Sequence, residues 1–201
     1  MSDTLRFGRL VPHRTAHLCI DMQRLFAQGS PWHAPWLERV LPRVVMLARQ
    51  HPDRNVFTRF MPPMHAGDLP GSWRHYYEKW PQVTLAHLPR HMLDLVAPLD
   101  ELAKVGHVID KSFYSPFHGT ALRAWLQAHE VDSLIISGTE TDVCVAAAVS
   151  TAVDYGYRVV LASDAVCSSA DASHDAQMTL YRTRLSQQIE VAEVADILAQ
   201  W

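Results

Sequence analysis

Three residues, Asp21, Lys111 and Cys144, have side chains that could work together in nucleophilic chemistry. A cysteine attacks as the thiolate, and its reference pKa of about 8.5 falls beside a cation or a helix N-terminus. Lys111 would supply the cation, and Asp21 would take the thiol proton and later give it to a leaving amine. Each has a plainer role when taken alone, because lone cysteines mostly pack in cores, lysines are mostly solvated and an aspartate can cap a loop. The case for a site depends on their predicted placement at one edge of the fold.

Cys144 lies in the stretch GTETDVCVAA, where a strand is predicted to end and a helix over 141–156 to begin. Thr141 is the predicted cap of that helix. The free amide N–H groups of a first helical turn favour an anion and could form an oxyanion hole. The other two cysteines, Cys19 and Cys167, are predicted to be structural.

Apolar runs that alternate with amphipathic segments predict the elements that position these residues. Strands are predicted at 16–21, 54–60, 105–110, 131–138, 157–166 and 187–193. Helices are predicted at 34–50, 120–129, 141–156, 171–186 and the C-terminal end. Pro42 should kink or shift the first of these helices.

This alternation predicts an α/β fold, a three-layer sandwich in which helices cover both faces of a mostly parallel sheet. Ligand sites in such sheets gather beyond the carboxyl ends of the strands. Asp21, Lys111 and Cys144 follow three different predicted strands, so we expect their side chains to meet at that edge.

A segment without regular alternation, residues 61–106, interrupts the pattern and holds many prolines, glycines and aromatic rings. A long irregular segment within a compact domain is usually functional. A short helix is expected at 91–104. The rings that could form the wall of a pocket are Trp73, Tyr76, Tyr77 and Trp80.

The predicted substrate contacts are Gln23, Phe26, Trp80, Tyr114 and Phe117. The aromatic rings could equally pack under the long segment or form a subunit contact, because aromatic clusters serve cores, interfaces and pockets alike. Arg74 and Lys79 could hold a substrate carboxylate or lie on a solvated helix face.

The composition excludes several classes of protein. The chain has 201 residues, 48% of them hydrophobic, and a formal net charge of -3, which predicts a single domain over 1–201 and no basic surface for nucleic acid. No apolar run reaches the roughly 18–20 residues that span a bilayer, and the N-terminus has no apolar signal core. Three scattered cysteines do not suggest a disulfide framework. We therefore expect a cytoplasmic protein that binds a small molecule and neither nucleic acid nor a membrane.

Four segments of the chain resemble the isochorismatase-like cysteine hydrolases, which include nicotinamidases, N-carbamoylsarcosine amidases and ureide hydrolases. They are CIDMQRLF at 19–26, DKSFYSPFHGTAL at 110–122, SGTETDVCV at 137–145 and GYRVVLASDAVCSS at 156–169. Together they extend over nearly the whole chain. Their order and spacing are more specific than any one of them.

The resemblance implies a role for each residue. Asp21 would be the proton shuttle, Lys111 the charge stabiliser and Cys144 the nucleophile. A cis peptide would join Thr139 to Glu140, and the N–H groups of Glu140 and Cys144 would form the oxyanion hole. The implied enzyme has a six-stranded parallel sheet, cleaves a small amide or ureide through a thioester, and forms a homo-oligomer, a dimer or a tetramer.

The chain departs from the family's metal-dependent nicotinamidases after the second strand. Those enzymes carry Asp-x-His there, whereas this chain has Phe60 and Pro62, which cannot ligate a metal. His65 and His75 are dispersed and form a weak alternative. The sequence therefore predicts no catalytic metal and no other cofactor, and a pyridine amide becomes a less favoured substrate.

Three alternatives remain beside the amidohydrolase. An isochorismatase-type vinyl-ether hydrolase would not need the thiol. A catalytically silent redox or ligand-sensing module would retain the fold without turnover. A flavodoxin-like electron carrier is disfavoured, because no phosphate-binding glycine loop follows the first strand.

Overall fold

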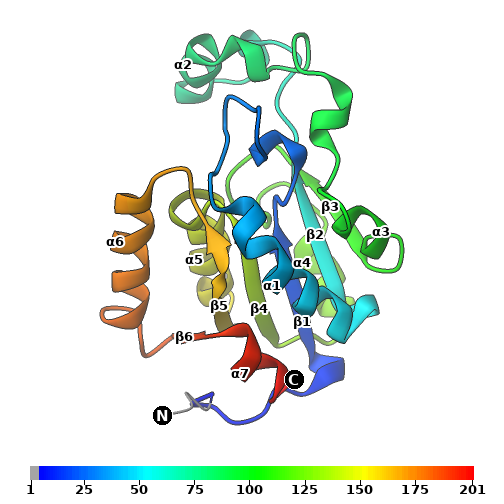
Figure 1. The fold of residues 1–201 in the computed structure, drawn as a ribbon, viewed down its shortest axis with the longest axis vertical. Helices are drawn as coiled ribbons and strands as arrows, with labels where there is room; N and C mark the ends of the chain where they lie inside the picture. Colours follow the sequence, from blue (N-terminus) through cyan, green and yellow to red (C-terminus); the bar gives the residue numbers. More distant parts are fainter. Residues whose placement is uncertain (1–4) are drawn as a thin grey trace.

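A six-stranded sheet in the order β3-β2-β1-β4-β5-β6 forms the centre of the molecule (Figure 1). The computed structural model describes residues 5–201. The strands are β1 Thr15–Ile20, β2 Asn55–Phe60, β3 His107–Lys111, β4 Ser133–Thr139, β5 Arg158–Cys167 and β6 Ile189–Ala192. All neighbouring strands are parallel, which confirms the predicted fold class. The strand order reverses between β1 and β4, the kind of position at which α/β sheets open a crevice for ligands.

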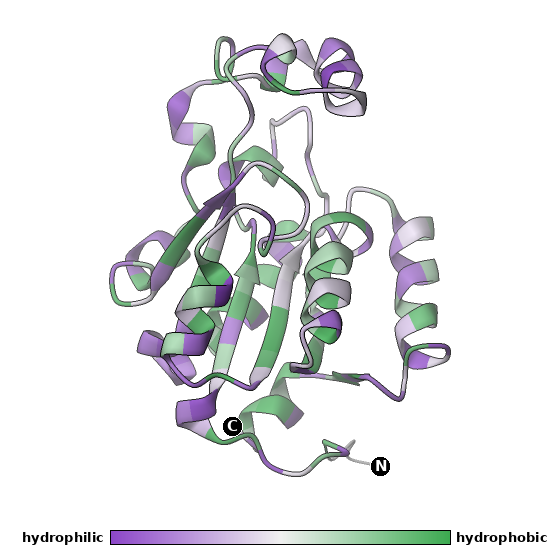
Figure 2. Cartoon of the chain, turned by 180° about the vertical axis from the view of Figure 1, so that it is seen from behind, coloured by the Kyte–Doolittle hydropathy of each residue, from purple (hydrophilic) through white to green (hydrophobic). Residues whose placement is uncertain are grey.

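Helices cover both faces of this sheet. Their bounds are α1 Leu37–Gln50, α3 Leu99–Leu102, α4 Leu122–Ala128, α5 Ala146–Asp154, α6 Asp171–Arg182 and α7 Val194–Leu198. In Figure 1 α1 and α7 lie in front of the sheet, and Figure 2 shows α4 and α5 over the other face, with apolar strands between the layers. The α1 helix continues through Pro42 without a break, and it begins three residues later than predicted. No helix among residues 5–201 is long and apolar enough to cross a membrane.

The two central strands approach each other closely at their carboxyl ends. Gly138 has a φ of +114°, and a Cβ atom there would lie 2.1 Å from the carbonyl oxygen of Ile20. Only glycine tolerates both this backbone region and this contact. The glycine therefore lets the chain that follows β4 come close to Asp21, which follows β1.

Most of the segment 61–106, including α2, Ser72–Lys79, lies beyond the carboxyl edge of the sheet at the top of Figure 1, and its last part, with α3, lies beside the sheet. The helix expected at 91–104 is not continuous. A 3-10 turn, Arg90–Leu93, is separated from the one-turn helix α3 by an extended stretch. In that stretch Leu95 pairs with Gln23 as an antiparallel bridge and Val96 donates its N–H to the Met22 carbonyl. Pairing with distant backbone thus replaces helical hydrogen bonds there.

Candidate active site

The structure brings Asp21, Lys111 and Cys144 together at the carboxyl edge of the sheet. Asp21 follows β1, Lys111 is the last residue of β3, and Cys144 lies in the turn after β4. The Nζ atom of Lys111 is 2.7 Å from Oδ2 of Asp21 and 3.4 Å from Sγ of Cys144. The expectation that these three side chains meet is confirmed, and they do so at the point where the strand order reverses.

Asp21 is held in place by a residue of the neighbouring strand. Its backbone has a φ of +49°, a left-handed conformation that aspartate tolerates better than most residues. The Thr58 hydroxyl in β2 donates to Oδ1 of Asp21 at 2.6 Å and accepts from the Asp21 N–H at 3.0 Å. Both side chains are fully buried. The sequence analysis missed Thr58, whose only signal is a hydroxyl within an otherwise apolar buried strand.

Lys111 is a buried cation with several partners. In addition to Asp21 and Cys144, it donates to the Phe113 carbonyl at 3.1 Å, and its Nζ lies 4.8 Å from the centre of the Phe60 ring. Burial disfavours the charged form, but Asp21 and Cys144 outweigh it and raise the pKa of Lys111. The lysine is therefore a fixed positive charge at neutral pH.

The Cys144 thiol is nearly enclosed, with 5% of the residue exposed. Burial raises the pKa of this thiol; the charge of Lys111 lowers it, and the charge of Asp21 raises it again. The net shift is upward, so the expectation of a lowered thiol pKa was wrong. The pKa rises because burial removes the thiolate from water, and the attraction of one lysine that is already paired with Asp21 does not compensate for that loss. The resting site thus holds a protonated thiol beside a carboxylate.

The turn that carries Cys144 is wider than an α-helix. Thr141–Val145 is π-helical, with the Val145 N–H bonded to the Glu140 carbonyl five residues earlier, and α5 begins only at Ala146. Thr141 does not cap the helix as predicted, because its hydroxyl is 2.9 Å from Nδ1 of His174 in α6. The predicted cis peptide between Thr139 and Glu140 is present.

A cavity of about 310 Å³ opens above Cys144. Its walls are mainly aromatic, with one carboxylate and one imidazole. The lining residues are Phe26, Pro31, Trp32, His33, Phe60, Tyr76, Trp80, Tyr114, Glu140, Val143, Cys144 and Ser169. Three of the predicted substrate contacts, Phe26, Trp80 and Tyr114, are among them.

Two of the predicted substrate contacts are placed elsewhere. Gln23 is fully buried, and its amide bonds to the backbone N–H and carbonyl of Phe60 and to the carbonyl of Leu93. It therefore ties β1 to β2 and to the segment above, and no polar atom is left for a substrate. Phe117 lines a different hollow and packs on Tyr155, with ring centres 5.5 Å apart.

Other residues of the segment 61–106 that were candidates for the pocket lie outside the cavity. Tyr77 is fully buried, and Trp73 packs on Tyr114, with ring centres 4.8 Å apart, outside the cavity. Neither Arg74 nor Lys79 lines the cavity. The sequence analysis missed Trp32, whose ring centre is 5.9 Å from those of Phe60 and Tyr76.

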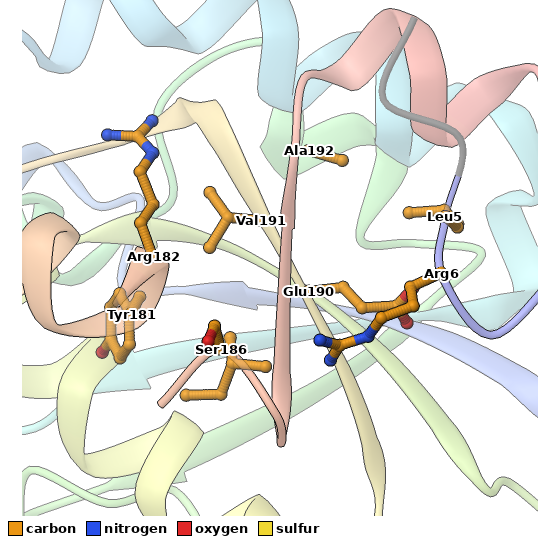
Figure 3. A pocket seen from close by; sticks show the side chains of 9 residues that line it. Leu5, Arg6, Tyr181, Arg182, Ser186, Glu190, Val191 and Ala192 are labelled. Carbon is orange, nitrogen blue, oxygen red and sulfur yellow. The ribbon is translucent and has the colours of Figure 1, made fainter. Parts of the chain in front are cut away.

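A second hollow, of about 260 Å³, lies at the side of the sheet formed by the edge strand β6, between β6 and α6 (Figure 3). Its one buried acid, Glu190, is already paired with Arg158 at 2.7 Å. Cys19 and Cys167 are both buried and lie outside both hollows. Within residues 5–201, no three potential metal-ligating side chains are grouped together.

Comparison with known proteins relates this chain to a family of hydrolases. Residues 15–193 match the isochorismatase domain. The chain is 27% identical over 179 residues to maleamate amidohydrolase of Pseudomonas putida, across 86% of this chain and 79% of that enzyme. It is 28% identical over 165 residues to N-carbamoylsarcosine amidase of Arthrobacter sp., across 77% of this chain and 60% of that enzyme.

The fold is also found among solved structures. A cysteine hydrolase from Pseudomonas syringae pv. phaseolicola 1448A superimposes with a TM-score of 0.81 at 24% identity, covering 100% of this chain and 98% of that one. This likeness shows the shared fold. Because the domain match covers most of the chain, the protein belongs to the isochorismatase family of hydrolases.

Proposed function

We propose that the protein is a cysteine-dependent amidohydrolase that cleaves a C–N bond of a small amide or ureide through a thioester. The observation that carries this proposal is the position of Lys111 Nζ within 2.7 Å of Asp21 and 3.4 Å of Cys144, below a cavity of substrate size. The named activities of the two amidase relatives agree with it.

The reaction begins with a carbonyl group held over Cys144. Because the thiol rests protonated, Asp21 takes its proton as sulfur attacks the carbonyl carbon. The oxygen becomes negatively charged, and the N–H groups of Glu140 and Cys144 are the proposed donors to it. Asp21 then protonates the nitrogen, the C–N bond breaks, and ammonia or an amine leaves a thioester on Cys144.

Water completes the cycle. Asp21, again a carboxylate, accepts a proton from a water that attacks the thioester, and the thiol and the acid product are released. Lys111 remains protonated throughout and stabilises whichever neighbour is negative, the carboxylate or the departing thiolate.

A vinyl-ether hydrolase would leave the contact between Lys111 and Cys144 without a use, so we favour the amidohydrolase over that alternative. The same intact set disfavours a silent sensor. We expect a homo-oligomer, a dimer or a tetramer, which light scattering after size-exclusion chromatography measures directly.

The test is ammonia release from a panel of nicotinamide, carbamoylated amino acids, biuret and aliphatic amides. We expect release by the wild type, none above background by Cys144→Ala, and a mass increase on Cys144 in quenched wild-type samples. Full activity of Cys144→Ala would overturn the thioester mechanism. Reversible oxidation of Cys144 without turnover of any amide or vinyl ether would instead favour the sensor.

A further inference from the structure

The charged side chain in the cavity lining is an acid. Glu140 is a carboxylate in its lining, whereas no lysine or arginine among residues 5–201 lines it. Lys111 lies below, with its side chain fully buried and its charge already shared between Asp21 and Cys144. Of the described residues that line the cavity, His33 is the one with a titratable nitrogen. An anionic substrate would therefore meet a negative wall without a strong cation to receive it.

The aromatic walls favour the opposite charge. Trp32 stands beside Phe26, with ring centres 6.1 Å apart, and beside Tyr76 at 5.9 Å, and Trp80 and Tyr114 complete the enclosure. The faces of such rings carry negative electrostatic potential and attract a cation, most strongly when water is excluded. Rings together with one carboxylate form a typical site for an ammonium group.

The Glu140 carboxylate lines the same cavity as these rings. Burial raises the pKa of Glu140, hydrogen bonds from the side chain and backbone of Ser169 lower it, and the charges of Asp142 and Asp21 add to the rise. Burial and Tyr114 raise the pKa of Tyr76, and the charge of Glu140 adds to that shift. The Ser169 N–H donates to Oε1 of Glu140 at 3.0 Å, and Ser169 is the residue whose hydrogen bonds hold the carboxylate. A charge held this way is stabilised by a ligand that brings a positive group.

We propose that Glu140 is a specificity-determining residue, and that the substrate is an amide carrying a cationic ammonium-type group held by Glu140 and the aromatic rings. This inference rests on the proposed amidohydrolase function and adds the charge of the substrate. It separates the protein from relatives whose names state maleamate and N-carbamoylsarcosine as substrates, since both of those amides carry a carboxylate.

Glu140 could instead serve only to hold the backbone of Ser169. Glu140→Gln separates the two roles, because the amide oxygen of glutamine still accepts from the Ser169 N–H while the charge is lost. Asp142→Asn is the matched control: it removes one negative charge from the same turn, at a side chain that bonds to the Ser168 hydroxyl and does not line the cavity.

The experiment compares small amides of three charges: β-alaninamide and 4-aminobutanamide as cations, butanamide and pentanamide as their neutral counterparts of matching length, and succinamate as the anion. Ammonia release gives kcat/KM for each. Calorimetry on Cys144→Ala, with and without Glu140→Gln, gives the affinity without turnover, so that a failure of the proposed chemistry is distinguished from a failure of the charge preference.

We expect one of the two cations to exceed its neutral counterpart at least about tenfold in kcat/KM and in affinity, and succinamate to be the poorest ligand. The ratio should fall to about one in Glu140→Gln and persist in Asp142→Asn. A preference that is absent, that favours succinamate, or that survives Glu140→Gln would overturn the proposal, as would failure of both cations to bind the Cys144→Ala protein. Binding with the expected preference but without turnover would support the charge assignment and contradict the amidohydrolase.

Discussion

Lys111 Nζ lies 2.7 Å from Oδ2 of Asp21, and neither side chain has any surface exposed to solvent. Each charge has lost its hydration and depends on the other for stabilisation. The same pair contacts the thiol through Lys111 Nζ. The proposed function therefore couples stability and catalysis at this contact. Three predictions concern this contact and its neighbours, and a fourth concerns a buried histidine of β1.

Removing one member of the pair should destabilise the fold and abolish activity. Lys111→Met leaves the Asp21 carboxylate buried without its cation, a loss of about 3–5 kcal/mol in the free energy of unfolding. Urea denaturation monitored by circular dichroism measures it. The double variant Asp21→Asn/Lys111→Met should recover much of that stability while remaining inactive, since both charges are gone. A double variant as unstable as the sum of the two single variants would contradict the coupling.

The thiol should become easier to ionise when Asp21 loses its charge, although activity disappears. The Asp21 charge raises the pKa of Cys144 and Lys111 lowers it, so Asp21→Asn leaves the lysine unopposed. The pH midpoint for alkylation of Cys144 by iodoacetamide, followed by mass spectrometry, should move down in Asp21→Asn and up in Lys111→Met. Cys144→Ala reports any labelling of the other buried cysteines, and a midpoint that rises in Asp21→Asn would disprove this account.

Thr58 should act as a positioning residue for Asp21. Thr58→Val keeps the shape but removes the hydroxyl that donates to Oδ1 and accepts from the Asp21 N–H. We expect kcat to fall roughly 10–100-fold with a smaller change in KM, and the free energy of unfolding to decrease by about 1–3 kcal/mol. Thr58→Ser, which retains the hydroxyl, should recover most of kcat. Equal rates for the two variants would assign Thr58 a purely structural role.

His17 should make the fold sensitive to acid. It is fully buried in β1, between Asn55 Oδ1 and Ser137 Oγ at 2.7 Å each, and burial lowers its pKa to about 4 while the bond to Asn55 opposes that shift. The unfolded chain binds the proton near pH 6.5, whereas the folded chain resists it until about pH 4. The stabilisation of the fold by neutral His17 is therefore complete above the pKa of the unfolded chain. It is lost as the pH falls from about 6.5 to about 4, and the free energy of unfolding decreases by about 3 kcal/mol in total.

The comparison variant for this effect is His17→Gln, which has no titrating ring. The free energy of unfolding, measured by urea denaturation at about pH 7 and about pH 4, should differ by about 3 kcal/mol less in the variant than in the wild type. The subtraction removes the contribution of carboxylates shared by both proteins. An identical pH dependence in the two proteins would show that His17 does not titrate in this window.

Much of the site could be predicted because its positions follow from topology. Alternating apolar strands and helices determine a parallel sheet, and parallel strands place their carboxyl ends at one edge. Asp21, Lys111 and Cys144 follow three such strands, so local patterns were sufficient to bring them together. The adjacency of Thr58 to Asp21, 37 residues apart in sequence, depends on the register between β1 and β2, which no local pattern specifies.

The environment of the nucleophile was decided by tertiary packing. A helix N-terminus and a lysine suggested a lowered thiol pKa, but enclosure by the cavity walls raises it, and enclosure depends on segments far away in sequence. The segment 61–106 has no periodicity from which its path could be predicted, although Trp80 could be named as a pocket residue. Trp32 was missed because it lies in the irregular stretch between β1 and α1, where no local pattern shows which ring faces the cavity. The sequence by itself determined the sheet and the three reactive groups. The three-dimensional packing decided which rings surround them and that Glu140 is the carboxylate in the cavity wall.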